Sequence, residues 1–300
     1  MFNYILYKIG QFIAFSLPLK AAYKIAVFFS DIHYIFADKD RAAVKANLKA
    51  IFPEKTELEL RRIRISMFRN FAKYLVDFFR YAKMDKEYIK NKLKVENPHY
   101  LDQALSSGKG IIVLSAHIGN WELGGVIIAL LGYDLWVVAL EHKYKKINDF
   151  FDAQRKSKGV NVIPFNKAVR QSINILRENK LLALVGDRDF TKEGGTILNF
   201  FGKPTSFPKG PAALSLKTGA AIVPAFMVRN EDDSFTLKIN PPIDLTLQEE
   251  KPHSPDDKNS FTKMSEKDLQ ELTKRYTIII EDYIKKYPDQ WYMFRKFWVE

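Results

Sequence analysis

Residues 110–122 have the sequence GIIVLSAHIGNWE, and this stretch decides the expected fold. Its first half is apolar and rich in β-branched residues, which is typical of a strand that is buried on both faces. Gly119 then permits a tight turn, and the apolar residues from Asn120 to Leu131 predict a helix. A buried strand that passes directly into a helix is the repeating unit of an α/β protein.

The same alternation continues toward the C-terminus. Strands are predicted at 134–140, 160–163, 181–186 and 221–228, with an edge strand at 234–239, and helices are predicted at 146–158, 169–177 and 211–218. Strands that alternate with helices predict a central, mostly parallel sheet flanked by helices. Ligand sites in such sheets lie beyond the carboxyl ends of the strands, so we expect the functional site at His117 and at Gly186-Asp187.

The N-terminal third has a different composition. Residues 1–95 contain 19 Lys and Arg against 9 Asp and Glu, and the first 36 residues are apolar and aromatic, with no acidic residue before Asp31. The apolar run falls short of the roughly 20 residues that cross a bilayer. We therefore expect residues 1–36 to be a membrane-associating segment that lies on or dips into a membrane face. The alternatives are a true membrane span and an amphipathic helix that packs on the core.

Residues 37–100 are predicted to form a helical region. Two helices are expected around a break at Phe52-Pro53, and the acidic residues at 54–59 favour the start of the second one. That helix carries an aromatic stripe, which is interpreted either as core packing or as a wall for a lipid chain: Met67, Phe68, Phe71, Leu75, Phe78 and Phe79. Residues 101–300 are predicted to form the α/β core, with a polar, mobile loop at 246–261 and a C-terminal helix that ends before Pro288.

The overall charge predicts an anionic partner. The chain has 47 Lys and Arg and 35 Asp and Glu, a net charge of +12, which suits a nucleic acid, a phospholipid surface or a phosphorylated substrate. A nucleic-acid-binding protein is the weaker hypothesis, because no recognition motif is present and much of the basic excess lies beside the apolar N-terminal segment. The chain contains no cysteine, which excludes disulfides and thiolate nucleophiles, and its five histidines leave little material for a metal site.

A histidine at the end of a buried strand is suited to acid–base chemistry. We interpret His117 as a general base that takes a proton from a bound hydroxyl group. Either Glu122, five residues later, or Asp187, at another strand end, is expected to orient its ring. The backbone amides of Gly119 and Asn120, at a helix start, are expected to stabilise a developing oxyanion. This pattern favours direct transfer to the hydroxyl over a covalent enzyme intermediate.

The second strand end carries charges that suit a phosphate group. Arg188 and Asp189 follow Asp187, and a guanidinium group recognises phosphate well. Lys203 and Lys209 are expected to extend this edge, and the alternative interpretation of all these charges is a solvated turn.

Apolar residues and glycines near this turn are candidates for an apolar groove. Gly194-Gly195 and Phe200-Phe201-Gly202 are expected to form the floor of the groove, with core packing of the two phenylalanines as the alternative. His142 follows a predicted strand and is a further candidate for lining the site.

Several segments, in order along the chain, resemble one family. They are KANLKAIFPEKTELE at 45–59, SAHIGNWELGG at 115–125, GDRDF at 186–190, FFGKPTSFPKG at 200–210 and PDQWYMFRKFW at 288–298. The second is similar to the His-x4-Glu signature of the lysophospholipid-acyltransferase-like superfamily. Together they resemble the lauroyl and myristoyl transferases that act late in lipid A biosynthesis, and the similarity extends over almost the whole chain.

The resemblance implies a membrane-associated O-acyltransferase, in which the groove expected at 194–202 would be an acyl groove. Such an enzyme moves a fatty acyl group from a thioester of acyl carrier protein or coenzyme A to a hydroxyl of a lipid A precursor, without a metal or a further cofactor. It implies a place at the cytoplasmic face of a bacterial inner membrane, in contact with its lipids, through a peripheral or single N-terminal anchor. The same chemistry on another membrane glycolipid or aminolipid is the alternative.

Overall fold

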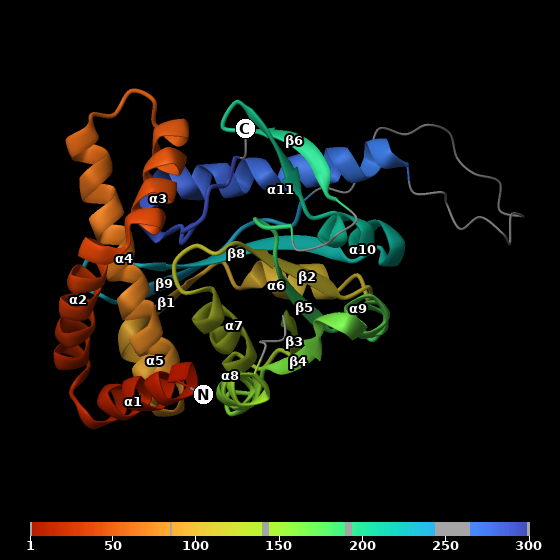
Figure 1. Ribbon diagram of the computed structural model, residues 1–300. Coiled ribbons are helices and arrows are strands. Elements are labelled where there is room, and N and C mark those ends of the chain that lie inside the picture. The colour runs from red at the N-terminus through yellow and green to blue at the C-terminus, as the bar shows by residue number, and fades with distance from the viewer. Residues whose placement is uncertain (1, 85, 140–143, 190–193, 244–264, 299–300) are drawn as a thin grey trace, which may run out of the picture.

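The computed structural model describes residues 2–84, 86–139, 144–189, 194–243 and 265–298. A seven-stranded sheet lies at its centre with helices on both sides (Figure 1). The strand order is β1-β9-β8-β2-β5-β3-β4, and all neighbours are parallel except β8 and β9, which are antiparallel. The predicted α/β fold with a mostly parallel sheet is therefore confirmed.

All strands of the main sheet except β1 correspond closely to predicted ones. The bounds of the seven strands are β1 Leu93–Glu96, β2 Ile111–Ser115, β3 Leu135–Ala139, β4 Asn161–Pro164, β5 Leu181–Val185, β8 Ala221–Arg229 and β9 Phe235–Ile239. Two further strands, β6 Thr196–Phe200 and β7 Lys203–Phe207, pair as an antiparallel hairpin. The hairpin and β1 were not expected from the sequence.

Alternation along β2 explains why both faces of the sheet are covered. Ile111 and Val113 face α6 (His99–Leu105), α7 (Trp121–Leu130) and α8 (Lys145–Lys156). Ile112 and Leu114 face α9 (Ala168–Arg177), α10 (Gly210–Thr218) and α11 (Glu266–Lys286). All four side chains are almost completely buried. Burial of one such side chain stabilises the fold by about 1.5–3 kcal/mol, so a strand that is apolar on both faces requires helices on both.

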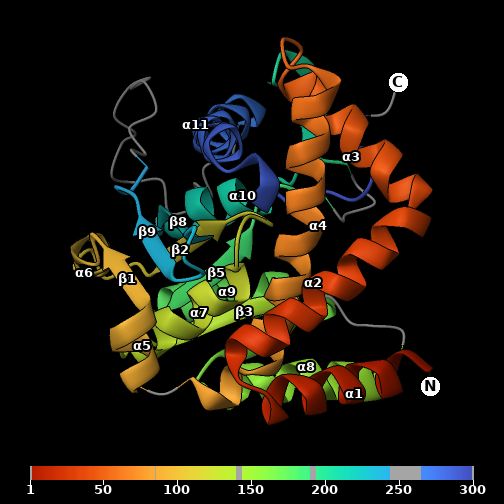
Figure 2. The same ribbon diagram turned by 90° about the vertical axis from the view of Figure 1, so that its left-hand side faces the viewer.

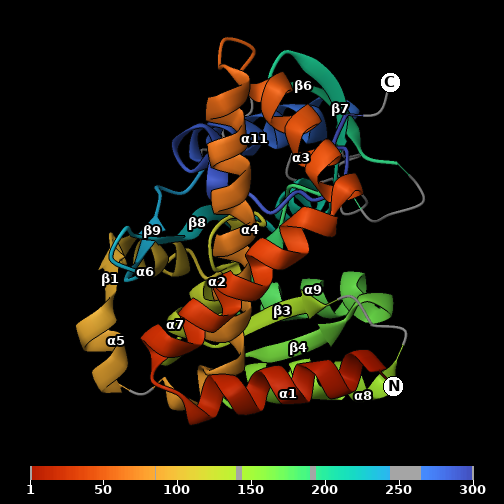
Figure 3. The ribbon, with the colours of Figure 1, turned by 60° about the vertical axis from the view of Figure 1, so that its left-hand side comes forward.

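The N-terminal helices pack beside this core. They are α1 Phe2–Ser16, α2 Leu19–Phe36, α3 Asp38–Ile51, α4 Glu57–Phe79 and the short α5 Lys86–Lys92. The break at Phe52-Pro53 lies between α3 and α4 as predicted, and Thr56 and Glu59 form a capping box at the start of α4. Figure 2 and Figure 3 show α1 lying alongside α8 and α2 crossing α4.

The apolar N-terminal segment is two helices rather than one, because Pro18 separates α1 from α2. Both helices bury small and aromatic side chains on the rest of the chain, among them Ala14, Ala22 and Tyr23. Large apolar side chains remain exposed on the same helices: Ile9, Phe12, Phe28, Phe29, Ile32, Ile35 and Phe36. Within the described part of the chain, no helix combines the length and the hydropathy that a membrane crossing requires.

Two sequence expectations fall on residues that are not described. The polar loop at 246–261 and His142 lie outside the described residues.

Candidate active site

His117 lies in a short turn between the carboxyl end of β2 and the start of α7. The C-terminal segment runs along this turn: Ile118 and Trp291 form an isolated β-bridge, and the amide of Tyr292 donates to the carbonyl of His117 at 3.0 Å. The turn that carries His117 is therefore held by backbone contacts from the C-terminal segment.

The imidazole of His117 contacts Asp187. Nδ1 of His117 lies 2.7 Å from Oδ1 of Asp187, and the backbone amide of His117 donates to the same oxygen at 3.1 Å. The second oxygen, Oδ2, accepts a hydrogen bond from Nε1 of Trp291 at 3.1 Å. Because β2 and β5 are parallel neighbours with Ser115 opposite Val185, their carboxyl ends bring His117 and Asp187 together.

The charge of Asp187 is stabilised by its surroundings. The side chain is completely buried, and burial alone raises the pKa of a carboxyl group. The attraction and hydrogen bond of His117, the charge of Arg188 and the Trp291 hydrogen bond outweigh burial and hold the pKa of Asp187 well below its usual range. A carboxylate on Nδ1 leaves Nε2 as the nitrogen that can exchange a proton with a substrate.

Glu122 has a different partner. Its carboxylate binds Arg155 of α8, with Oε1 at 2.5 Å from Nη2 and Oε2 at 3.0 Å from Nε. Both side chains are largely buried. Of the two carboxylates expected to orient His117, the structure brings Asp187 to the ring and directs Glu122 to Arg155.

Glu122 and Arg155 lie at the border of an apolar cavity. The cavity has a volume of about 90 Å³ and lies between α7, α8 and the sheet. Ser115, Trp121 and side chains of β2, β3, β5 and β8 also line it. The Trp121 ring contacts His117, with ring centroids 5.0 Å apart, so the cavity begins beside the imidazole.

The amides of Gly119 and Asn120 do not face an oxyanion position. The amide of Gly119 donates to the carbonyl of Gln290 and that of Asn120 to the carbonyl of Met227, each at 2.8 Å. The expectation that these two donors form an oxyanion hole is therefore not met, because both are used within the fold. The side chain of Asn120 caps α7 by accepting from the amide of Leu123 at 3.1 Å.

The three basic residues expected to form a phosphate-binding edge have different surroundings in the structure. Arg188 points inward, where it donates to the carbonyl of Tyr292 and lies 3.9 Å from Asp187. Lys209 forms an ion pair with Glu266 at 2.9 Å, and Lys203 is exposed on β7.

The remaining acidic residue of this turn contacts the hairpin. Asp189 accepts a hydrogen bond from Ser206 of β7 at 3.3 Å. Ser206 in turn accepts from the amide of Gly195 at 2.9 Å, so this glycine is part of the connection between the turn and the hairpin.

The aromatic candidates for the acyl groove divide between two places. Phe200 is completely buried among Phe207, Phe297 and Trp298, which agrees with core packing rather than with a groove floor. In the stripe along α4, Met67 and Phe78 belong to the core. The other four members, Phe68, Phe71, Leu75 and Phe79, line an apolar groove of about 490 Å³ between α1, α2 and α4.

Two residues of the site were missed from the sequence. Arg155 had no local signal, since it lies 33 positions from its partner Glu122 on an otherwise ordinary amphipathic helix. Trp291 belongs to the PDQW segment, whose family resemblance marked it without indicating a contact. Among the described residues, no group of three or more histidines and carboxylates is arranged to hold a metal ion.

Comparisons with known proteins identify related sequences. A family model described as bacterial lipid A biosynthesis acyltransferase matches residues 1–300. A phosphatidylinositol mannoside acyltransferase of Mycolicibacterium smegmatis is 29% identical over 79% of this chain and 72% of its own length. A protein of the same name from Mycobacterium tuberculosis is 29% identical over 59% of this chain, which spans 57% of that protein. A lipid A biosynthesis acyltransferase of Haemophilus influenzae is 21% identical over 70% of this chain and 66% of its own length.

We expect Gly119→Ala to destabilise the protein more than Gly108→Ala. Both glycines have positive φ, +60° and +71°, where an alanine costs about 1–2 kcal/mol. A Cβ at position 108 meets no atom within 4 Å, whereas at position 119 it lies 2.0 Å from the carbonyl oxygen of Met227. Urea unfolding of both variants measures the difference, and equal losses would contradict the packing of this turn.

We expect the stabilising effect of Asp187 to disappear in acid. The folded pKa lies below that of the unfolded chain, about 3.9, so the contribution is complete above that pH and is lost as the pH falls toward the folded value. The difference in unfolding free energy between wild type and Asp187→Asn should thus shrink as the pH falls below about 4. Urea unfolding across this range provides the measurement, and a difference independent of pH would argue against a stabilised carboxylate.

Proposed function

The chain belongs to the bacterial lipid A biosynthesis acyltransferase family, and we propose that it transfers a fatty acyl group from a thioester donor to a hydroxyl group of a membrane glycolipid. Family membership makes the chain an acyltransferase and favours an enzyme over the nucleic-acid-binding alternative. The observation that carries the proposed chemistry is the contact of His117 with the buried carboxylate of Asp187 at the carboxyl edge of the sheet.

The proposed reaction is a direct transfer. Nε2 of His117 accepts the proton of the acceptor hydroxyl as its oxygen attacks the thioester carbonyl carbon. The carbon–oxygen bond forms, the carbon–sulfur bond breaks, and the thiolate leaves. The imidazolium then returns its proton to the thiolate, which gives an ester and a free thiol. The negative charge of Asp187 favours the imidazolium and holds the ring through Nδ1.

The donor is proposed to be acyl carrier protein or coenzyme A carrying the acyl chain. We infer that the cavity behind Trp121 receives the acyl carbons next to the thioester. Its volume of about 90 Å³ lies well below the roughly 300–1,000 Å³ of typical ligand pockets, so a long chain requires the apolar lining to move. Arg188, Lys203 and Lys209 remain candidates for the phosphate groups of either substrate.

The acceptor is proposed to be a lipid A precursor or another membrane glycolipid. The names of the relatives support both classes, since the mycobacterial proteins are named for phosphatidylinositol mannoside and the Haemophilus protein for lipid A. A lipid acceptor is consistent with the exposed aromatic side chains of α1 and α2, beside which Lys20 and Lys24 are also exposed. We propose that these two helices rest on the cytoplasmic face of a bacterial inner membrane, as amphipathic interfacial helices do.

We expect His117→Ala to lower kcat by about 10²–10⁴-fold, the usual contribution of a general base. Asp187→Asn should impair turnover more than Glu122→Gln, because Asp187 contacts the ring and Glu122 contacts Arg155. The measurement is acyl transfer from a labelled thioester to a lipid A precursor and, in parallel, to a phosphatidylinositol mannoside. The exposed His99 serves as control through His99→Ala. A folded His117→Ala protein with wild-type turnover on both acceptors would refute the mechanism.

We expect the triple variant Phe12→Ser, Phe28→Ser, Phe36→Ser to bind anionic vesicles more weakly than wild type. These side chains are 72%, 61% and 77% exposed, so their loss removes apolar surface from the proposed membrane face without opening the core. The matched control is Val169→Ser with Ile197→Ser, which are 71% and 60% exposed elsewhere on the surface. Vesicle co-sedimentation measures binding, and equal binding by both variants would exclude this face as the membrane contact.

A further inference from the structure

A buried ion pair lies close to the His117 turn, outside the proposed catalytic pair. Asp77 of α4 is completely buried, Arg229 at the end of β8 is 6% exposed, and their charged groups are in direct contact. Removal of two charges from water costs several kcal/mol per ion, which their attraction repays only when further hydrogen bonds complete the site. The further partners of this pair indicate what it does.

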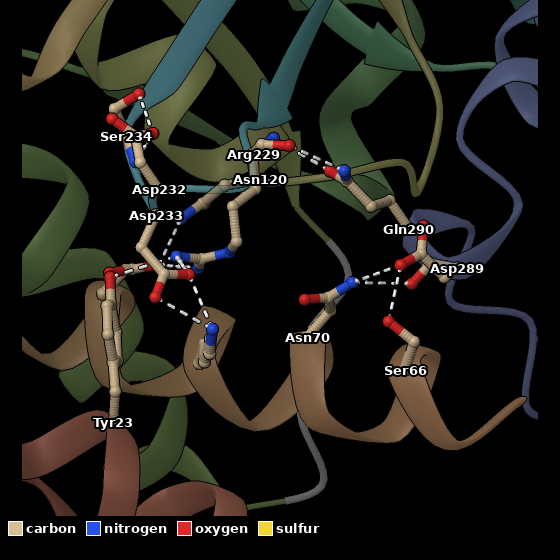
Figure 4. Close-up of polar contacts among 12 residues, drawn as sticks. Tyr23, Ser66, Asn70, Asn120, Arg229, Asp232, Asp233, Ser234, Asp289 and Gln290 are labelled. Carbon is tan, nitrogen blue, oxygen red and sulfur yellow. Dashed lines mark hydrogen bonds and ion pairs between the residues drawn. The ribbon is translucent and has the colours of Figure 1, made fainter. Parts of the chain in front are cut away.

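The pair connects three helices with the sheet. The hydroxyl of Tyr23 on α2 donates to Oδ1 of Asp77, and Nη1 of Arg229 contacts the same hydroxyl at 3.1 Å. Figure 4 shows Tyr23, Arg229 and Asn120 converging on one point from different elements. The third element is α7, because Nδ2 of its capping residue Asn120 donates to Oδ2 of Asp77 at 3.3 Å.

The contact with Asp77 fixes the orientation of the Asn120 amide. A carboxylate accepts hydrogen bonds only, so it selects the amino end of the side chain. Oδ1 of Asn120 is then directed to the amide of Leu123 and to the hydroxyl of Tyr81, both at 3.1 Å. The contact with Asp77 and the cap of α7 therefore require the same orientation of the Asn120 side chain.

Arg229 reaches the same turn by a second route. Its backbone amide donates to Oε1 of Gln290 at 2.9 Å, and its carbonyl accepts from Nε2 of Gln290 at 2.8 Å. The carbonyl of Gln290 in turn accepts the amide of Gly119. Figure 4 shows Gln290 lying between Arg229 and the neighbouring Asp289, which is bound by Ser66 and Asn70 of α4.

One route begins at the carboxylate of Asp77 and the other at the backbone of Arg229, and they end three and two residues after His117. We propose that Asp77 and Arg229 are positioning residues, which hold the His117 backbone in its catalytic geometry through Asn120 and Gln290. This inference rests on the proposed function of His117. Asp187 orients the ring, whereas the ion pair determines where the turn that carries the ring lies.

The first test is Asn120→Ser. Serine is a good N-cap, so α7 keeps its cap, but the shorter side chain does not reach Asp77. A displacement of about 1 Å at a catalytic group can cost on the order of 10²-fold. We expect kcat to fall by about 10- to 100-fold on that basis, with little change in the KM for the thioester. The near-ultraviolet circular dichroism signal is the folding control, and we expect it to stay at the wild-type level. A loss of folded protein would instead lower this signal and the activity in the same proportion.

The second test exchanges the two groups. Asp77→Asn and Asn120→Asp should each lower kcat. The first leaves Arg229 only the partly exposed carboxylate of Asp233, at 3.4 Å, and the second places two carboxylates in contact. The double variant restores one amide, one carboxylate and the net charge. We therefore expect its kcat, relative to wild type, to exceed the product of the relative kcat values of the two single variants. The control is Lys180→Met, which removes ion pairs with Asp134 and Glu178 at the amino end of β5, away from His117.

The outcomes separate this inference from the proposed function. A wild-type kcat for Asn120→Ser would overturn the positioning role. So would a double variant whose relative kcat does not exceed the product of the relative kcat values of the two single variants. If Asp77→Asn does not fold, Asn120→Ser decides alone. A parallel His117→Ala sample that is inactive, beside an Asn120→Ser sample that is fully active, leaves the proposed function standing and rejects only the role of the ion pair.

Discussion

The buried carboxylate of Asp187 is the interaction on which the candidate site depends. An isolated charge at this depth is costly, and the structure compensates it with two donors from His117, one from Trp291 and the nearby charge of Arg188. These groups come from the turn after β2, the end of β5 and the C-terminal segment. The buried charge of Asp187 is therefore compensated only when these three parts of the chain have come together. The orientation of the His117 ring depends on the same tertiary contacts.

The parallel sheet explains why these groups meet, and the sequence predicted that part well. The alternation of strands and helices placed His117 and Asp187 beyond the carboxyl ends of two strands, and β2 and β5 are neighbours. The sequence did not show whether Glu122 or Asp187 orients the His117 ring, because spacing along the chain does not show where a side chain in the first turn of α7 points. That direction is determined by Arg155, a tertiary partner on α8. A contact between residues 70 positions apart became visible only once the strand order was known.

Other differences between prediction and structure have equally local causes. The strand β1 has only four residues and little alternation, so it carries no periodic signal. In the β6–β7 hairpin, Phe201 and Gly202 occupy the turn with positive φ, and Pro204 lies in a strand, where proline is unusual outside an edge. The amides of Gly119 and Asn120 were expected to be free because a helix start leaves its first donors unpaired. The carbonyls of Gln290 and Met227, which the local sequence does not reveal, take both.

The positions of three arginines show which part of the basic excess is neutralised within the fold. Arg155, Arg188 and Arg229 each lie against a largely or completely buried carboxylate, Glu122, Asp187 and Asp77 respectively, so within the fold they contribute little net charge. The unbalanced charge belongs chiefly to the N-terminal third, which holds a net +10 of the total +12. Exposed charges act over about 8–10 Å at physiological salt, so their field is strongest at the surface of α1 to α4. The same helices α1 and α2 expose aromatic side chains, so the membrane contact proposed for them would combine electrostatic attraction to anionic lipid with burial of apolar surface.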